Sequence, residues 1–132
     1  MPNSSARACR NPNLFVLTGG PGAGKTTVLL ELEKRGYRVV PEVARQIIQE
    51  QVRDGGRALP WGDRKLYTDL MLMRSVESYL QNSSATQPIF FDRGVPDTMG
   101  YARLIGLEDQ APSRRACDQH CYAACVFVAP PW

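Results

Sequence analysis

A glycine-rich segment near the N-terminus constrains the fold of this chain more than any other feature. Residues 19–26 read Gly-Gly-Pro-Gly-Ala-Gly-Lys-Thr, which fits the pattern G-x-x-x-x-G-K-[ST]. The segment follows the apolar run at 14–17 and precedes a helical pattern. A buried strand, such a loop and a helix, in that order, form a phosphate-binding unit of parallel α/β proteins. We therefore expect a strand over 14–17, a phosphate loop over 19–24 and a helix over 25–35.

Short apolar runs alternate with helical patterns along the rest of the chain. The runs predict strands over 37–40, 89–91 and 126–128, and helical spacing predicts helices over 41–52, 63–81 (with Asp63 as N-cap), 96–105 and 117–124. Wholly apolar strands that alternate with helices are typical of a parallel sheet with helices on both faces. The expected fold is α/β, a P-loop three-layer sandwich with a mostly parallel sheet and four visible strands.

Composition places the chain among ordinary globular proteins. Of its 132 residues, 43% are hydrophobic and 22% are charged, and this length suits one domain. The polar residues 1–13 predict a flexible arm without the features of a signal peptide, ahead of a domain at 14–132. No apolar run approaches the roughly 18–20 residues that cross a bilayer, and a net charge of +3 is too small to indicate nucleic acid binding. We expect a cytoplasmic protein that binds neither nucleic acid nor membranes.

The phosphate loop predicts which groups would contact a nucleotide. Backbone N–H groups of the loop would surround the β-phosphate, Lys25 would reach the β- and γ-phosphates, and the Thr26 hydroxyl would bind Mg²⁺. Thr27 would lie near the α-phosphate. The expected ligands are ATP and Mg²⁺, with the choice between ATP and GTP left open. The predicted nucleotide-binding residues are Gly19, Gly20, Pro21, Gly22, Ala23, Gly24, Lys25, Thr26 and Thr27.

Polar side chains follow two further apolar strands. Asp92 ends the strand predicted over 89–91, in the arrangement called Walker B, and would orient Mg²⁺ or position a phosphate acceptor. Glu42 and Arg45 follow the strand predicted over 37–40 and share one helix face with two glutamines. One interpretation is a solvated ion-pair face. The other makes Glu42 a base or hydroxyl anchor and Arg45 a grip for phosphate or carboxylate. The residues alone leave both open.

The cysteines are a weaker signal. Three of the four recur every fourth residue, so they would share one face of the helix predicted over 117–124. Their spacing matches no familiar zinc site. We interpret them as small buried hydrophobic residues without a metal, and in a reducing compartment we expect no disulfide. The four are Cys9, Cys117, Cys121 and Cys125.

Several of these segments together resemble a known family. They are similar to the small AAA-labelled P-loop proteins related to the ribosylnicotinamide kinase domain of the bacterial NAD regulator. The resemblance spans 14–132 and implies an ATP- and Mg²⁺-dependent kinase for a nucleoside- or nucleotide-like acceptor. It rests on Leu17–Thr27, Pro41–Arg45, Phe91–Gly94, Asp97, Tyr101 and Val126–Trp132. It implies catalytic roles for Lys25, Glu42, Asp92 and Arg93, acceptor binding by Glu42, Arg45 and Arg93, and magnesium binding by Thr26 and Asp92.

The family pattern continues beyond the Pro-Pro-Trp segment into an arginine-bearing lid, a fifth strand and a closing helix. Because the sequence ends at Trp132, we expect a C-terminally truncated domain with an exposed sheet edge that favours self-association. Two other functions stay open, a regulatory ATPase or GTPase-type switch and a non-catalytic nucleotide-binding fragment. The sequence lacks the N-K-x-D motif of common GTPases, and its D-x-x-G string at Asp97–Gly100 falls inside a predicted helix.

Overall fold

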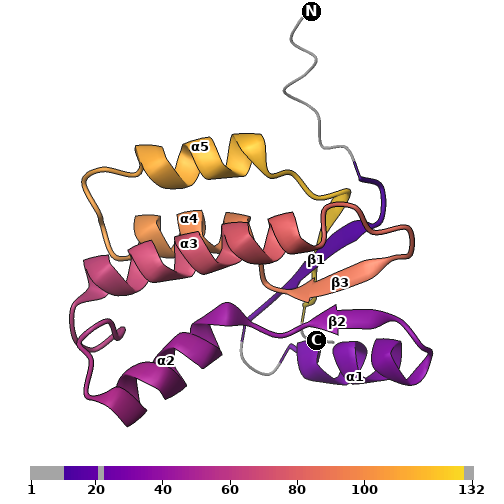
Figure 1. Ribbon diagram of the computed structural model, residues 1–132, viewed down its shortest axis with the longest axis horizontal. Helices are drawn as coiled ribbons and strands as arrows, with labels where there is room; N and C mark the ends of the chain where they lie inside the picture. Colours follow the sequence, from indigo (N-terminus) through magenta and orange to yellow (C-terminus); the bar gives the residue numbers. More distant parts are fainter. Residues whose placement is uncertain (1–10, 21–22, 130–132) are drawn as a thin grey trace, which may run out of the picture.

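The computed structural model describes residues 11–20 and 23–129. In the described part, helices and strands alternate along the chain (Figure 1). The elements are β1 (Leu14–Thr18), α1 (Lys25–Lys34), β2 (Arg38–Val40), α2 (Val43–Asp54), α3 (Arg64–Gln81), β3 (Ile89–Asp92), α4 (Val95–Leu104), α5 (Ala111–Gln119) and β4 (Ala124–Phe127).

The described strands form a four-stranded sheet in the order β2-β3-β1-β4, and each neighbouring pair is parallel. This confirms the predicted α/β class and the parallel sheet. Leu17 of β1 lies opposite Asp92 of β3, and Thr18 lies opposite Phe127 of β4. The carboxyl ends of the strands therefore meet at one edge of the sheet, where ligands of such folds bind. The loop after β2, which carries Glu42, lies one strand further from β1 than Asp92 does.

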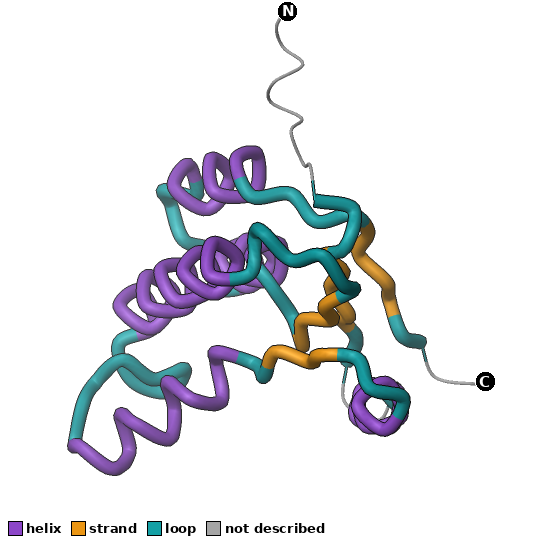
Figure 2. The backbone as a smooth tube through the Cα atoms, turned by 45° about the vertical axis from the view of Figure 1, so that its right-hand side comes forward, coloured by secondary structure: helices purple, strands orange, loops and turns teal. Residues whose placement is uncertain are grey.

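Helices cover both faces of the sheet (Figures 1 and 2). Helix α1 lies on one face, while α3, α4 and α5 lie on the other. The inner strands β1 and β3 are apolar on both faces because both of their faces are covered. On the side of α3, Leu14, Val16 and Phe91 are almost fully buried. On the side of α1, the Phe15 and Phe90 rings stack with centroids 5.4 Å apart.

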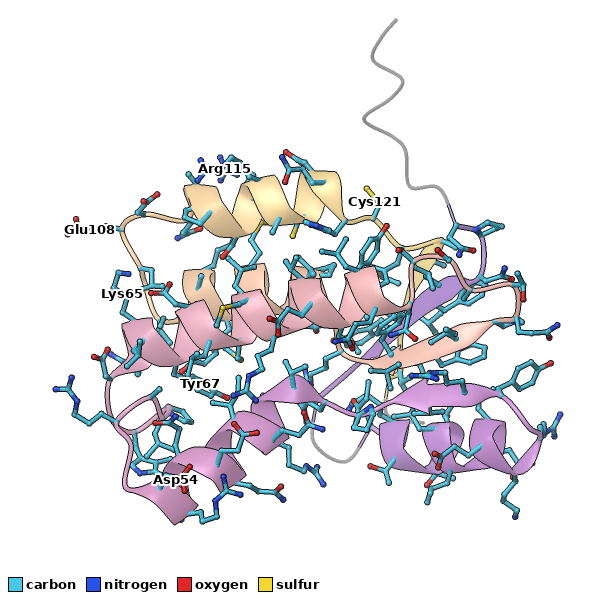
Figure 3. All side chains as sticks on the ribbon, viewed as in Figure 1. Asp54, Lys65, Tyr67, Glu108, Arg115 and Cys121 are labelled. Atoms are coloured by element: carbon cyan, nitrogen blue, oxygen red, sulfur yellow. The ribbon has the colours of Figure 1, made fainter. Side chains whose placement is uncertain are left out.

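A second apolar cluster joins α2 to α3 and thereby positions the segment after β2. Ile47 of α2 packs with Tyr67 and Met71 of α3 in this cluster. Tyr67 projects from α3 towards α2 (Figure 3). The Asp63 carboxylate accepts a hydrogen bond of 3.0 Å from the Leu66 N–H, which confirms Asp63 as the N-cap of α3. Across the described ranges, no helix combines the length and the apolarity needed to cross a bilayer.

The predicted helix over 117–124 is wrong. The helix there is α5, which begins six residues earlier and ends at Gln119, and β4 already starts at Ala124. Pro112 explains the early start, because proline is favoured in the first turn of a helix, where its missing N–H has no partner to lose. The regular spacing of the cysteines is thus unrelated to a helix.

The three C-terminal cysteines lie in different elements as a result. Cys117 belongs to α5, Cys121 to the following loop and Cys125 to β4. Cys117 and Cys121 are partly buried, whereas Cys125 is exposed, so its interpretation as a buried residue is wrong. Among the described residues, no three His, Cys, Asp or Glu side chains are grouped so that they could hold a metal ion. Cys9 lies outside the described residues.

Strand β4 forms one side of the sheet in the described part. It pairs with β1, and all four of its residues are exposed. Val126 and Phe127 are among the exposed large apolar side chains of the molecule. The expected self-association through an exposed edge stays a prediction, as does the truncation inferred from the family pattern. Pro130, Pro131 and Trp132 lie outside the described residues.

Candidate functional site

The predicted phosphate loop connects the end of β1 to the start of α1. Gly24, directly before α1, has a φ of +90°, in the left-handed region that glycine adopts without a steric penalty. Gly19 needs a small side chain for another reason, since a Cβ there would lie 2.6 Å from the carbonyl oxygen of Val128. Pro21 and Gly22 lie outside the described residues. A side chain would therefore not fit at Gly19, and Gly24 has a backbone conformation that other residues rarely adopt.

The start of α1 opens onto a cleft of about 420 Å³. The cleft is polar and lies beside the ends of β1 and β3. Arg45 lines it from α2, is exposed, and has no ion-pair partner among the residues that the structure describes. Thr27 does not line this cleft, but faces a separate hollow beside Leu30 and Glu31 of α1. The residues that line the cleft are Gly20, Ala23, Gly24, Lys25, Thr26, Glu42, Arg45 and Arg93.

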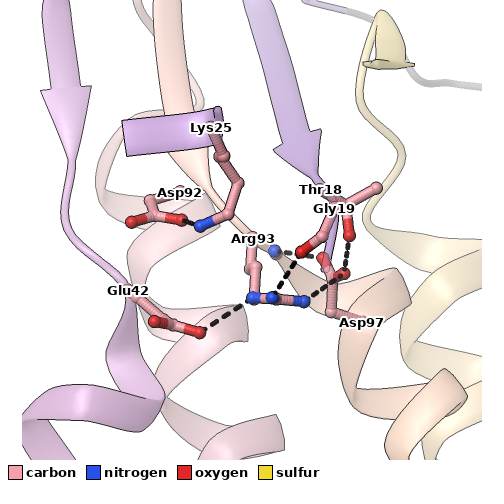
Figure 4. A network of polar contacts seen from close by, with 8 residues as sticks. Thr18, Gly19, Lys25, Glu42, Asp92, Arg93 and Asp97 are labelled. Carbon is pink, nitrogen blue, oxygen red and sulfur yellow. Dashed lines mark hydrogen bonds and ion pairs between the residues drawn. The ribbon is translucent and has the colours of Figure 1, made fainter. Parts of the chain in front are cut away.

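Lys25 and Asp92 form an ion pair at the carboxyl edge of the sheet (Figure 4). Lys25 is the first residue of α1, and Asp92 is the last residue of β3, so the strand pairing of β1 with β3 brings them together. Their side chains are only 12% and 18% exposed. Partial burial strengthens the attraction between opposite charges. The two groups predicted to contact phosphate and magnesium are therefore direct neighbours.

Arg93 connects the phosphate loop to the segment after β2 (Figure 4). Its Nε lies 2.9 Å from Oε2 of Glu42, and its Nη2 donates a hydrogen bond of 2.7 Å to the Gly19 carbonyl oxygen. The Arg93 backbone has a φ of +66°, which is uncommon for a residue other than glycine. Its N–H donates to the carbonyl oxygen of Leu17 at 2.9 Å. This backbone conformation directs the guanidinium across the end of β1.

Asp97 fixes the other side of this network, and the sequence patterns did not reveal its role. One carboxylate oxygen accepts a 2.6 Å hydrogen bond from the Thr18 hydroxyl and lies 3.7 Å from Nη1 of Arg93. The other accepts a 2.8 Å hydrogen bond from the Gly94 N–H, which caps the start of α4. Asp97 therefore holds Arg93, β1 and α4 in one arrangement. The sequence signal that could have indicated this role is an acidic residue three positions after Gly94, the N-cap of α4.

A second cavity, of about 190 Å³, lies between α2, α3 and α4. Glu42 and Arg93 line both this cavity and the polar cleft. Its inner wall includes the side chains of Tyr67, Met71 and Tyr101, and the two tyrosine rings meet edge to face at 5.5 Å. Burial raises the pKa of Tyr67 to about 12, with smaller contributions from Tyr101 and Glu42, so this phenol is neutral at physiological pH.

The candidate residues thus form two connected groups. Lys25, Thr26, Gly20 and Gly24 line the cleft, and Glu42 and Arg93, which form an ion pair, line both the cleft and the tyrosine-lined cavity. A comparison with protein families finds that an AAA domain family matches residues 14–132.

The chain belongs to this AAA domain family. The match covers both the phosphate loop and the second cavity, and it agrees with the parallel sheet and the Gly-Lys-Thr segment before and within α1. Membership in this P-loop family supports nucleotide binding as the function of the domain. A comparison with curated proteins found no match.

Proposed function

We propose that this AAA domain protein transfers the γ-phosphate of ATP to a hydroxyl group of a nucleoside- or nucleotide-like small molecule. One observation carries the proposal: the polar cleft at the phosphate loop and the tyrosine-lined cavity share Glu42 and Arg93 as lining residues. A phosphate donor in the cleft and an acceptor in the cavity would thus meet at the Glu42–Arg93 ion pair, which offers a carboxylate base and a positive charge. A protein that only binds or hydrolyses nucleotide would require the cleft alone.

The cleft supplies the groups that a nucleoside triphosphate requires. Gly24, Lys25 and Thr26, at the start of α1, all line this space. A helix N-terminus and a lysine together stabilise the negative charge of the β- and γ-phosphates. Arg45, which is exposed at the rim of the cleft, adds a further cation for phosphate or for a charged group of the acceptor.

The oxygen atoms beside Lys25 fit a magnesium ion. Mg²⁺ prefers hard oxygen ligands and commonly takes one or two protein oxygens together with phosphate oxygens and water. The hydroxyl of Thr26, which lines the cleft, and the carboxylate of Asp92 beside Lys25 would supply these protein oxygens. When bound, Mg²⁺ neutralises phosphate charge in reactions of this class.

In this proposal, Glu42 receives the acceptor proton. In the proposed step, an acceptor hydroxyl oxygen forms a bond to the γ-phosphorus while the bond from that phosphorus to the β,γ-bridging oxygen breaks. The hydroxyl proton passes to the Glu42 carboxylate, and ADP leaves with the electron pair. Arg93, 2.9 Å from Glu42 and anchored to Gly19, keeps that carboxylate at the boundary of the two spaces. Positioning of this kind supplies much of the rate enhancement in phosphoryl transfer.

The closer kinship with ribosylnicotinamide kinases and the cytoplasmic location stay predictions from the sequence. The decisive experiment measures MgATP binding by calorimetry and then γ-phosphate transfer from radiolabelled ATP to hydroxylated small molecules. Label appearing in an acceptor supports the proposal. Release of inorganic phosphate alone, at a rate that no acceptor changes, would instead identify a regulatory ATPase. Nucleotide binding without any turnover would identify a non-catalytic domain.

A further inference from the structure

The guanidinium of Arg93 is bound by protein oxygens from three different segments. Its Nε lies 2.9 Å from Oε2 of Glu42, its Nη2 donates to the Gly19 carbonyl oxygen at 2.7 Å, and its Nη1 lies 3.7 Å from Oδ1 of Asp97. Each nitrogen of this planar group therefore has a protein oxygen as its partner (Figure 4). This arrangement differs from the role that the family resemblance implies, in which Arg93 would bind the acceptor.

Moving Arg93 onto a ligand would leave two shielded carboxylates without a cation. The side chains of Glu42 and Asp97 are only 18% and 19% exposed, and among the described residues no other cation pairs with either of them. A shielded charge that loses its partner is costly. Lys25 differs, because Mg²⁺ can take its place beside Asp92 when Lys25 turns to a phosphate. Arg93 is therefore much less free than Lys25 to contact a ligand.

Asp97 holds Arg93 from outside the nucleotide cleft. It lines the tyrosine-lined cavity but not the cleft. Its Oδ1, which faces Arg93, also accepts the 2.6 Å hydrogen bond from the hydroxyl of Thr18, and its Oδ2 accepts the bond from the Gly94 N–H. The end of β1 and the start of α4 thus fix this carboxylate, and the carboxylate in turn fixes the guanidinium.

The bond from Arg93 to Gly19 fixes one peptide group of the phosphate loop. The Gly19 carbonyl and the Gly20 N–H belong to the same planar trans peptide group, so the direction of one determines the direction of the other. Backbone N–H groups bind phosphate only when they are held in the right direction, and a carbonyl oxygen that turned towards a phosphate would repel it. Loss of the Arg93 bond would free this peptide group to rotate.

We infer that Arg93 is a positioning residue of the phosphate loop and not a ligand of the acceptor, and that Asp97 and Thr18 keep it in that position. The inference rests on nucleotide binding in the cleft and does not require phosphate transfer. Arg45, which is exposed, lines the cleft and has no ion-pair partner among the described residues, is then the arginine available to a charged group of a ligand.

The test uses a substitution for which the two roles of Arg93 predict opposite results. Calorimetry measures ATP binding to the whole chain without Mg²⁺ and without an acceptor. Asp97→Asn removes a negative charge, so an Arg93 that binds phosphate would be released and ATP would bind more tightly. We expect ATP to bind about 2- to 30-fold more weakly, as for a residue that acts through others. Tighter or unchanged ATP binding overturns the inference.

Two variants of Thr18 test the same contact without a change of charge. Thr18→Val removes the hydroxyl that donates to Asp97 and should also weaken ATP binding, whereas Thr18→Ser keeps a hydroxyl and should stay within about twofold of the original chain. Unchanged affinity in Thr18→Val, or equal losses in both variants, overturns the inference. Valine is favoured in strands, so this pair of variants gives a result even if Asp97→Asn fails to fold.

Arg93→Lys keeps the charge but loses the planar group that reaches several oxygens at once. It should weaken ATP binding, and retention of the original affinity overturns the inference. Arg74→Gln is the matched control, because Arg74 is similarly exposed (29% against 34%), pairs with Glu50 and lies outside the cleft lining. It should bind ATP as the original chain does. A loss in Arg74→Gln as large as in Asp97→Asn overturns the inference, since both would then reflect a general loosening of the fold.

The two proposals fail separately. The expected affinities without any transfer of phosphate to an acceptor would contradict the proposed function alone. Transfer by the original chain, together with unchanged ATP affinity in Asp97→Asn and Thr18→Val, would contradict the positioning role alone. An original chain that binds no ATP would overturn both.

Discussion

The ammonium group of Lys25, at the start of α1, forms an ion pair with the carboxylate of Asp92, at the end of β3. A polyphosphate that approaches Lys25 competes with this carboxylate for the same cation. A divalent cation that binds Asp92 removes that competition and adds positive charge beside the phosphates. The affinity of the cleft for nucleotide is therefore expected to depend on both partners of the pair and on magnesium.

Replacing Lys25 tests the cationic partner. Lys25→Ala removes a charge-assisted contact and leaves Asp92 unpaired near the phosphates, which should weaken ATP binding by roughly 10- to 100-fold. ADP should lose less affinity, because it lacks the γ-phosphate. Isothermal titration calorimetry with both nucleotides measures the difference. Lys34→Ala, at the exposed end of the same helix, serves as the control. Unchanged ATP affinity in Lys25→Ala would exclude this loop as the phosphate site.

Replacing Asp92 tests the anionic partner, and whether ATP affinity rises or falls should depend on magnesium. Asp92→Asn leaves the Lys25 ammonium free for phosphate, so ATP without Mg²⁺ should bind a few-fold more tightly. The same change removes a ligand for Mg²⁺, so the gain in affinity on adding Mg²⁺ should shrink. Titrations with and without Mg²⁺ separate the two effects. Asp69→Asn, which breaks the exposed ion pair with Lys65 on α3, is the control. An unaltered magnesium effect in Asp92→Asn would contradict the role of Asp92.

Glu42 should affect transfer rather than nucleotide binding. Glu42→Gln keeps the size of the side chain but removes the base, and loss of a general base lowers a rate by about 10²- to 10⁴-fold. MgATP affinity should stay within a factor of three or so, since Lys25 and the loop are intact. Glu50→Gln, in the helix that follows Glu42 and paired with Arg74, is a control for removal of a nearby negative charge. Equal losses of binding and transfer in Glu42→Gln would mean that Glu42 belongs to the nucleotide site.

Local sequence patterns predicted the parts of this site that are built locally. The phosphate loop was predictable because a strand, a loop and a helix follow one another within residues 14–34, and Asp92 was predictable because it ends an apolar strand. The pairing of Arg93 with Glu42 and with Gly19 was not predictable in the same way. Arg93 is 51 positions from Glu42 and 74 positions from Gly19 in the sequence. Both contacts depend on a left-handed backbone at Arg93, which no sequence pattern indicates.

The wrong helix near the C-terminus shows a second limit. The spacing of the three cysteines matched one helix face, but Pro112 starts α5 earlier, and the pairing of β4 with β1 extends the backbone from Ala124. A tertiary contact with β1 thus overrode a local periodicity. The lining of the second cavity was also beyond sequence reasoning, because residues such as Ser75 and Thr98 come together only when α3 and α4 pack.

Burial of Tyr67 makes the stability of the fold sensitive to alkali. The pKa of this phenol is about 12 in the folded chain, against about 10 when it is unfolded. Below about pH 10 the phenol is protonated in both the folded and the unfolded chain, so its contribution to the free energy of unfolding does not change with pH. Above about pH 10 the unfolded chain loses the proton first, which favours unfolding. The free energy of unfolding should fall between about pH 10 and 12, by up to roughly 2–3 kcal/mol from this residue.

Urea unfolding at neutral pH and near pH 11 measures this loss. Tyr67→Phe should show a smaller alkaline loss than the original chain, although not zero, because burial also raises the pKa of Tyr101 and Tyr122. The control is Tyr37→Phe, which removes the hydroxyl of a tyrosine that is 41% exposed. An identical profile in Tyr67→Phe and the original chain would contradict the assignment to Tyr67.

Gly94 and Gly100 should respond oppositely to the same substitution, because they differ in the space around them. A Cβ at Gly94 would lie 2.7 Å from the Tyr122 hydroxyl oxygen and 2.9 Å from Cγ2 of Val16, both fixed in the core. The Tyr122 hydroxyl also accepts a hydrogen bond of 3.1 Å from the Val95 N–H, so the ring cannot move without cost. Gly94→Ala should therefore destabilise the fold by roughly 1–3 kcal/mol.

Gly100 lies inside α4, and apart from its chain neighbours and the backbone of its own helix no described atom lies within 4 Å of the position that a Cβ would take. Alanine is favoured over glycine in a helix by up to about 1 kcal/mol, so Gly100→Ala should raise the melting temperature while Gly94→Ala lowers it. Thermal unfolding followed by circular dichroism gives both values under one condition. A melting temperature that falls in both variants, or in neither, would contradict the packing of Tyr122 against Gly94.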